Sequence, residues 1–247
     1  MRRLAILVLA TLPAAAAWAV ECRDIAQNTN RFTVCEADAA REDLRLFLLD
    51  KTGTVYASFA RIETDLAASG DTLAFAMNAG MYHASRAPVG YYLEDGKELQ
   101  RLVTSDGPGN FGLLPNGVFC IRDGRADVIE TGRFDHEKPA CSHASQSGPM
   151  LVIDGNLHPR FLKDSTSRYV RNGVGTSADG QRVVFAISNN PVTFHEFGRL
   201  YRDVLKLPQA LYFDGNVSRL HAPGLGRSDP GFAMGPIVGV VAPAAGN

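Results

Sequence analysis

The feature that most constrains the fold is a turn dipeptide, Asp-Gly, which recurs between short apolar segments. Four copies lie between two predicted strands: Asp95-Gly96, Asp123-Gly124, Asp154-Gly155 and Asp179-Gly180. Asp-Gly between two β-prone runs is a strong hairpin signal, because the two central residues of a tight hairpin loop need positive φ and these residues tolerate it. Four such turns predict an antiparallel meander.

The segments beside these turns are the predicted strands. They cover residues 90–93, 99–103, 118–122, 126–130, 150–153, 157–161, 171–176 and 183–188. Further strands are predicted at 73–77, 211–214 and 236–241, and a hairpin at 45–59 with strands at 46–49 and 54–57. These patterns predict an antiparallel core rather than alternating βα units.

Two helices complete the predicted elements. Residues 62–68 carry a short helical pattern, and an amphipathic run over 194–205 follows the capping box Thr193-x-x-Glu196 and stops before Pro208. The predicted fold class is therefore α+β: a mainly antiparallel β-sheet core built from a meander of hairpins, with a few packed helices.

Residues 1–19 have the pattern of a secretory signal peptide. Arg2 and Arg3 precede an apolar run over 4–16, and Ala17-Trp18-Ala19 is a small-x-small cleavage site. The apolar run is too short for a membrane anchor. We expect signal removal, a periplasmic or secreted protein without membrane insertion, and one domain over residues 20–247.

The four cysteines, Cys22, Cys35, Cys120 and Cys141, suit such a compartment. Nearest-neighbour pairing gives Cys22–Cys35 and Cys120–Cys141, although four cysteines allow three pairings. Each of these loops would add roughly 3 kcal/mol of stability. Residues 20–42 lack periodicity, so we expect them to form an N-terminal flap tied to itself by the first bond.

Composition excludes several classes of function. The net charge of −1 implies no general affinity for nucleic acid. No C-x-x-C motif and no pair of histidines at ligand spacing is present, so neither a metal nor another cofactor is indicated.

Polar residues beside glycines recur at the predicted strand ends. They are Asn78 with Gly80, Asn116 with Gly117, Ser147 with Gly148, Asn172 with Gly173, Ser188 with Asn189, and Asp214 with Gly215. Each alone is typical of a turn. If several converge at one rim, their amides, hydroxyls and backbone N–H groups would form a pocket typical of a sugar or phosphate site.

Five of these stretches, in this order, resemble the phosphodiester glycosidase family. They are Met77-Asn78-Ala79-Gly80-Met81-Tyr82, Asn116-Gly117-Val118-Phe119, Gln146-Ser147-Gly148-Pro149-Met150-Leu151, Arg171-Asn172-Gly173-Val174-Gly175 and Leu211-Tyr212-Phe213-Asp214-Gly215. The resemblance covers roughly residues 70–242. Many family members read Asp-Gly-Gly-x-Ser where this chain has Asp214-Gly215-Asn216-Val217-Ser218, which indicates a bacterial exported branch.

The best-known members of that family remove N-acetylglucosamine from a phosphodiester. The resemblance implies an exported hydrolase that cleaves a sugar-1-phosphodiester or a related glycosidic bond in the cell envelope. Asp214 is the candidate carboxylate for water activation or cation stabilisation, and Arg171, with Arg168 next, the candidate for the phosphate charge. The candidate substrate-binding residues are Asn78, Gly80, Asn116, Gly117, Ser147, Gly148, Asn189, Gly215 and Ser218.

The alternative is a non-catalytic periplasmic protein that binds glycans or phosphoglycans through the same pocket. Both hypotheses imply a carbohydrate or sugar-phosphate ligand, and they differ only on turnover.

Overall fold

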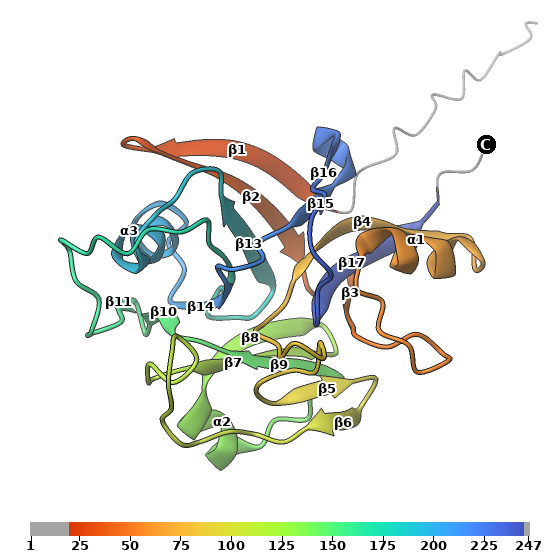
Figure 1. Cartoon of the computed structure of the whole chain (residues 1–247), viewed down its shortest axis with the longest axis horizontal. Helices are drawn as coiled ribbons and strands as arrows, with labels where there is room; N and C mark the ends of the chain where they lie inside the picture. Colours follow the sequence, from red (N-terminus) through yellow and green to blue (C-terminus); the bar gives the residue numbers. More distant parts are fainter. Residues whose placement is uncertain (1–19, 245–247) are drawn as a thin grey trace, which may run out of the picture.

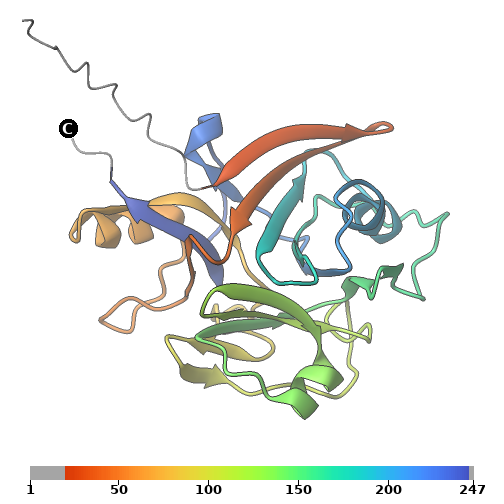
Figure 2. The same ribbon diagram turned by 180° about the vertical axis from the view of Figure 1, so that it is seen from behind.

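The computed structural model describes residues 20–244, so the predicted signal peptide over residues 1–19 lies outside the described part. Three antiparallel sheets surround a shared core, and the third sheet, in yellow and green, lies below the other two (Figures 1 and 2). The predicted fold class is confirmed. The hairpins are distributed among the sheets, so strands far apart in sequence become neighbours.

The first sheet has seven strands. Their order is β1 (Glu21–Gln27), β2 (Asn30–Asp38), β13 (Arg182–Ser188), β12 (Asn172–Thr176), β14 (Gln209–Asp214), β10 (Met150–Ile153) and β11 (Asn156–Leu157). The prediction of a flap over residues 20–42 is wrong, because β1 and β2 form a hairpin that joins β13. Most residues of β2 are buried on both faces, so this strand lacks the alternation that marks a half-exposed strand.

The second sheet has five strands. Their order is β16 (Arg227–Ser228), β15 (Leu220–Ala222), β4 (Asp71–Asn78), β17 (Ile237–Pro243) and β3 (Asp43–Phe47). The predicted hairpin over 45–59 is only partly right, because β3 pairs with β17 and the return segment touches the outgoing one at a single bridge, Leu49–Val55. Asp50 explains this: its side chain accepts the amides of Thr52 and Thr54 and replaces ladder bonds.

The third sheet also has five strands. Their order is β6 (Lys97–Gln100), β5 (Tyr92–Glu94), β9 (His143–Ser147), β7 (Gly117–Arg122) and β8 (Arg125–Glu130). The central strand β9 is absent from the predictions, because its sequence His-Ala-Ser-Gln-Ser is polar, yet all five of its residues are buried. Both predicted disulfides, Cys22–Cys35 and Cys120–Cys141, are present.

The helices are short and lie outside the sheets. They are α1 (Phe59–Ala67), α2 (Thr131–Glu137), α3 (Phe194–Arg199), a π-helical turn (Leu200–Val204) and a 3-10 turn (Pro223–Leu225). The Thr193–Glu196 capping box is confirmed. Within residues 20–244, no helix has the length and apolar character needed to cross a membrane.

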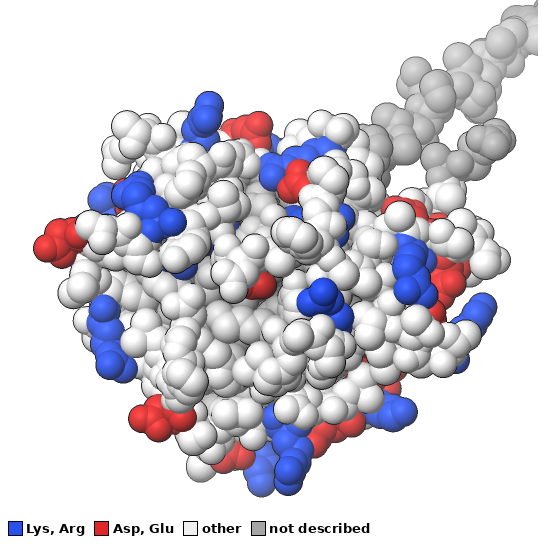
Figure 3. All heavy atoms as spheres, viewed as in Figure 1, with Lys and Arg blue, Asp and Glu red and all other residues white. Residues whose placement is uncertain are grey.

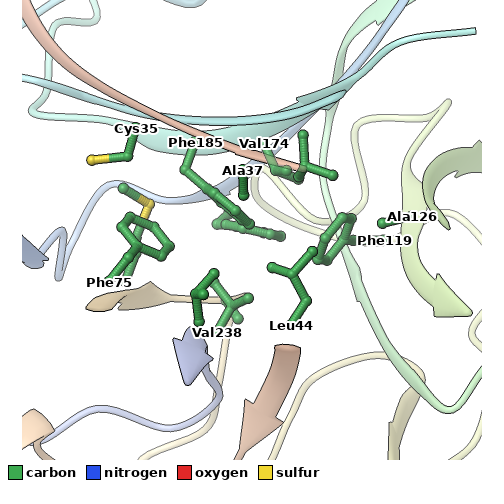
Figure 4. Packing of buried hydrophobic residues seen from close by; sticks show 14 of the residues in the cluster. Cys35, Ala37, Leu44, Phe75, Phe119, Ala126, Val174, Phe185 and Val238 are labelled. Atoms are coloured by element: carbon green, nitrogen blue, oxygen red, sulfur yellow. The ribbon is translucent and has the colours of Figure 1, made fainter. Parts of the chain in front are cut away.

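One aromatic cluster joins the three sheets. Phe185 of β13 stacks on Phe75 of β4, with ring centroids 4.7 Å apart, and meets Phe119 of β7 edge-on at 5.9 Å (Figure 4). Each ring comes from a different sheet and all three are fully buried. The cluster therefore fixes the sheets against one another, and with them the strand ends that carry the polar residues.

Candidate functional site

A cavity of about 680 Å³ opens beside the end of β14. Its lining comes from five segments, within residues 81–89, 108–111, 167–169, 212–217 and 232–233. The face shown in Figure 3 is hollowed near its centre, and most charged side chains there lie toward the periphery. A cavity of this size has room for a ligand larger than a single sugar ring.

Asp214 is the carboxylate of this cavity. It is the last residue of β14, between β12 and β10, and is only 9% exposed. Its Oδ1 accepts the amides of Gly215 and Asn216, at 2.6 and 2.9 Å. Burial raises the pKa of Asp214, and these amides oppose the rise. The strand thus holds a carboxylate whose proton affinity exceeds that of an exposed aspartate.

Two phenols lie near this carboxylate. Tyr212, two residues earlier in β14, and Tyr82, after β4, both line the cavity. Burial raises the pKa of each phenol, and the charge of Asp214 adds to both rises. Both phenols therefore stay protonated. The Tyr82 hydroxyl donates its proton to the Ala233 carbonyl at 3.2 Å and can accept from a ligand, whereas the Tyr212 hydroxyl can donate to one.

Arg86 supplies the guanidinium of the cavity lining. Its carbon Cζ lies 5.4 Å from the centre of the Tyr82 ring, and its backbone has φ +73° in a turn where its amide donates to the His83 carbonyl. Among residues 20–244, no carboxylate forms an ion pair with it. This cation is therefore available to an anionic ligand.

Two buried asparagines hold the strand ends together. Asn172 Nδ2 donates to the Asn78 side-chain oxygen at 2.6 Å and to the Asn78 carbonyl at 3.1 Å. Asn172 Oδ1 accepts the amide of Asp214 at 3.0 Å, and Asn78 Oδ1 accepts the amide of Arg219. Asn78 is thus placed behind the cavity, and Asn172, which is not among the predicted site residues, links β4, β12 and β14.

Two serine hydroxyls form hydrogen bonds with the backbone at the same strand end. Ser147 Oγ donates to the carbonyl of Phe213 at 2.9 Å, and Ser218 Oγ lies 3.0 Å from the carbonyl of Asp214 and 3.2 Å from that of Val170. In this structure their hydroxyls bind backbone rather than line the cavity. They fix the turn in which Asp214 stands.

Asn116, Gly117 and Gly148 pack behind the part of the cavity lining that Phe111 forms. Asn116 Nδ2 donates to the Phe111 carbonyl at 3.0 Å. Gly148 and Gly117 allow close packing here: a Cβ on Gly148 would lie 2.5 Å from Cβ of Asn116, and one on Gly117 would lie 2.9 Å from a backbone oxygen. Gly80 has φ +153° and packs against Ser145.

Arg171 lies behind the cavity wall. It is 1% exposed, and its guanidinium packs 3.7 Å from the Phe194 ring centre and 5.4 Å from those of Tyr169 and Tyr212. Nε donates to the Val192 carbonyl at 2.9 Å, whereas the buried Nη1 has no hydrogen-bond partner in the described part of the chain. Burial lowers the pKa of Arg171. Arg171 does not line the cavity, and the rings of Tyr169 and Tyr212 lie between its guanidinium and a ligand there.

The predicted residues therefore divide into three groups. Asp214 and Gly215 line the cavity; Asn189 lies apart, where it bonds to Thr33 and Arg227; the others stand behind the wall. Arg86 is not among the predicted site residues, because nothing in its local sequence distinguishes it from an ordinary surface arginine. Tyr82 and Tyr212 occur inside the family stretches, which could have identified them.

The fold and the site define a class: an antiparallel three-sheet protein with a polar cavity that holds one buried carboxylate and one unpaired guanidinium. The family model described as phosphodiester glycosidase matches residues 71–224. The chain therefore belongs to the phosphodiester glycosidase family. It is also 30% identical over 220 residues to the uncharacterized protein YigE of Escherichia coli (strain K12), covering 88% of this chain and 84% of that protein.

Solved structures show the same fold. The catalytic domain of zebrafish N-acetylglucosamine-1-phosphodiester alpha-N-acetylglucosaminidase, auto-inhibited by its pro-peptide, aligns with a TM-score of 0.61 and 11% identity over 90% of this chain and 81% of its own. A hypothetical protein from Synechocystis gives 0.60 and 14%, over 89% and 61%. A Burkholderia pseudomallei protein described as exported gives 0.56 and 10%, over 85% and 74%.

Proposed function

We propose that this protein is a hydrolase that cleaves the bond between the anomeric carbon of a sugar and a phosphodiester. The observation that carries the proposal is that Asp214 and the unpaired Arg86 line one cavity in a chain of this family. A sugar-1-phosphodiester has a polar ring and one negative charge, which match a cavity with phenols, amides and a free guanidinium.

In the proposed reaction, the bond from the anomeric carbon to the phosphate oxygen breaks and that oxygen keeps the electron pair. Water forms the new bond to the anomeric carbon, and Asp214 accepts its proton. The phosphodiester is a good leaving group once its charge is stabilised, so a strong general acid is not required. Tyr212 would donate a hydrogen bond to a phosphate or sugar oxygen, and Tyr82, whose hydroxyl donates to the Ala233 carbonyl, would accept one from a sugar hydroxyl.

The charges around the cavity suit an anionic substrate. Arg86 would contact the phosphate directly, which is the role that the sequence analysis predicted for Arg171. Arg171 would act as a positioning residue, which holds the Tyr169 and Tyr212 rings and adds a buried positive charge behind them. Asn78, Asn116, Ser147, Gly148 and Ser218 would support the same geometry from behind, without touching the sugar.

Export to the cell envelope is part of the proposal. The two disulfides suit an oxidising compartment, and the pattern of residues 1–19 is that of a secretory signal. The bond to be cleaved would then belong to an envelope or extracellular glycan.

The test is hydrolysis of the methyl phosphodiester of N-acetylglucosamine 1-phosphate by purified protein from residue 20 onward. We expect turnover by the wild type, a loss of at least about a hundredfold in kcat for Asp214→Asn, and about tenfold or more in kcat/KM for Arg86→Gln. Arg101→Gln is the matched control, because Arg101 is exposed and outside the cavity lining.

Each outcome distinguishes the two hypotheses. The unfolding temperature of Asp214→Asn should not fall, so lost turnover would report on chemistry. Saturable binding of the diester without turnover by the wild type would support the non-catalytic glycan-binding alternative. Equal turnover by the wild type and Asp214→Asn would refute the role of this carboxylate.

A further inference from the structure

A second group of reactive side chains lies on the second sheet, outside the Asp214 cavity. It consists of Glu63 on α1, His221 on β15 and Ser228 on β16, and none of the three lines that cavity. Ser228 Oγ lies 3.0 Å from Nδ1 of His221, and Nε2 of His221 lies 3.2 Å from Oε1 of Glu63. A hydroxyl, an imidazole and a carboxylate in this order are the groups that activate a serine nucleophile.

The topology of the sheet brings these side chains to one face. His221 and Ser228 are directly opposite each other in the antiparallel pair β15–β16, so their side chains project from the same face. His221 is also opposite Ala76 of β4, and α1 packs against β4 (Figures 1 and 2). The helix therefore places Glu63 beside the histidine ring, while β16, at the edge of the sheet, leaves Ser228 exposed.

Two further contacts hold Glu63 in place. Oε1 accepts the amide of Leu73 at 3.0 Å, and Oε2 accepts the hydroxyl of Thr72 at 3.0 Å. Within the described residues, the buried Nε2 of His221 has no acceptor in line with its N–H, so Glu63 influences the ring through its charge.

This charge determines which ring nitrogen is free to act as a base. A carboxylate beside Nε2 favours the tautomer with the proton on that nitrogen, which leaves Nδ1 as the acceptor that faces Ser228. The two nitrogens have exchanged places relative to the serine-protease triad, but either nitrogen of a neutral imidazole can accept a proton.

The histidine ring is in the protonation state that a base requires. Its side chain is only 14% exposed, and the ring centroids of His221 and Phe59 are 5.7 Å apart. Burial lowers the pKa of His221, and the charge of Glu63 opposes this fall. The ring is therefore neutral at neutral pH, and the positive charge that it gains from a serine proton would be stabilised by Glu63.

We propose that Ser228 is the nucleophile of a second catalytic site, with His221 as its general base, which cleaves small acyl esters. Ser228 Oγ forms a bond to the carbonyl carbon of the ester, and its proton passes to Nδ1 of His221. The bond from that carbon to the alcohol oxygen then breaks, and the departing oxygen takes the electron pair and the proton from Nδ1. Water, which gives a proton to the same nitrogen, releases the carboxylic acid and restores the serine.

The position of Ser228 limits the substrate. An exposed hydroxyl on an edge strand reaches an ester group that projects from its carrier, such as an acetyl group on a sugar hydroxyl. Water has free access to the serine, so charges in the transition state are stabilised less than in a closed site, and we expect slow turnover. The reaction is separate from diester hydrolysis at Asp214 and does not depend on it.

A fluorophosphonate, which labels activated serines covalently, tests the proposal on the same purified protein. Peptide mass spectrometry gives the labelling rate of each serine at neutral pH. We expect Ser228 to be labelled at least about a hundredfold faster than Ser105, an exposed serine whose hydroxyl has no histidine partner within residues 20–244. His221→Asn keeps an acceptor near the position of Nδ1 but no base, so it should reduce the rate at Ser228 to that at Ser105. Glu63→Gln should reduce it about tenfold.

The pH dependence of labelling separates a base from a merely structural hydrogen bond. The rate at Ser228 should fall as pH drops through the pKa of His221, because the protonated ring accepts no proton, and the rate at Ser105 should show no such step. Hydrolysis of p-nitrophenyl acetate should be lost in Ser228→Ala, which changes one exposed side chain and should leave the unfolding temperature unchanged.

Three results would overturn the second site. They are labelling of Ser228 no faster than that of Ser105, an unchanged rate in His221→Asn, and ester hydrolysis that Ser228→Ala does not reduce. Because the readout is one labelled serine, failure of diester hydrolysis at Asp214 would leave this proposal standing, and failure of labelling would leave the proposed diester hydrolase standing.

Discussion

Asn172→Ala should destabilise the protein far more than its size suggests. Its side chain makes four hydrogen bonds, three with Asn78 and one with the amide of Asp214, and it is fully buried. Truncation leaves two buried donors without an acceptor, the Asp214 amide and Asn78 Nδ2. Each unsatisfied donor costs about 1–3 kcal/mol, so we expect a loss of about 3–4 kcal/mol in the free energy of unfolding.

Urea unfolding with the disulfides intact measures this loss. With a slope of about 2–3 kcal/mol per molar urea for a chain of this size, the midpoint should fall by about 1–2 M. Asn189→Ala is the control: Asn189 also follows a strand and bonds to Thr33 and Arg227, but it is exposed, so its loss should stay below about 1 kcal/mol. Equal midpoints for the two variants would refute the view that Asn172 fastens the strand ends.

Two further predictions concern the cavity and a buried acid. Gly215→Ala should perturb the cavity and lower the unfolding temperature, because the new Cβ would lie 2.3 Å from the hydroxyl of the buried Tyr212. Adding Tyr212→Phe to this variant should recover most of the lost unfolding temperature. If it recovers none, the clash is not the cause. Burial raises the pKa of Glu94 from 4.5 to about 7, so the folded state binds more protons than the unfolded state between these values. Stability should therefore fall as pH rises through that window. Glu94→Gln should reduce the change of the urea midpoint with pH more than Glu98→Gln does, because Glu98 is exposed.

The hairpins could be predicted from the sequence because their signal is local. Gly96, Gly124, Gly155 and Gly180 all have positive φ, as an Asp-Gly turn requires. Asp95 and Asp154 share it, so two of the four turns have both central residues in that region. The strands β2 and β9 could not be predicted, because most or all of their residues are buried without alternation along the segment. The strand β1 has no buried residue, so no apolar pattern marks it.

The site was predictable only in part, for a related reason. Asp214 and Asn78 both end a strand next to a small residue, and sequence does not distinguish the side chain that faces the cavity from the one that fastens it from behind. The structure makes the distinction through contacts: Asp214 lines the cavity, whereas both polar atoms of the Asn78 side chain are hydrogen-bonded inside the protein. Arg86 and Phe232 lie in connecting segments, where a cavity wall leaves no periodic signal.

We call the buried residues behind the cavity its frame and the residues that line it its wall, and this division has a consequence for specificity. The frame residues, such as Asn172 and Ser147, are fully buried and bonded to backbone, so replacing them should cost stability before it alters ligand choice. The wall residues Arg86, Tyr169 and Phe232 are partly or largely exposed, so they can change at little cost to folding. A chain of this family can therefore keep the Asp214 turn and its frame while the connecting segments determine which ligand the cavity accepts.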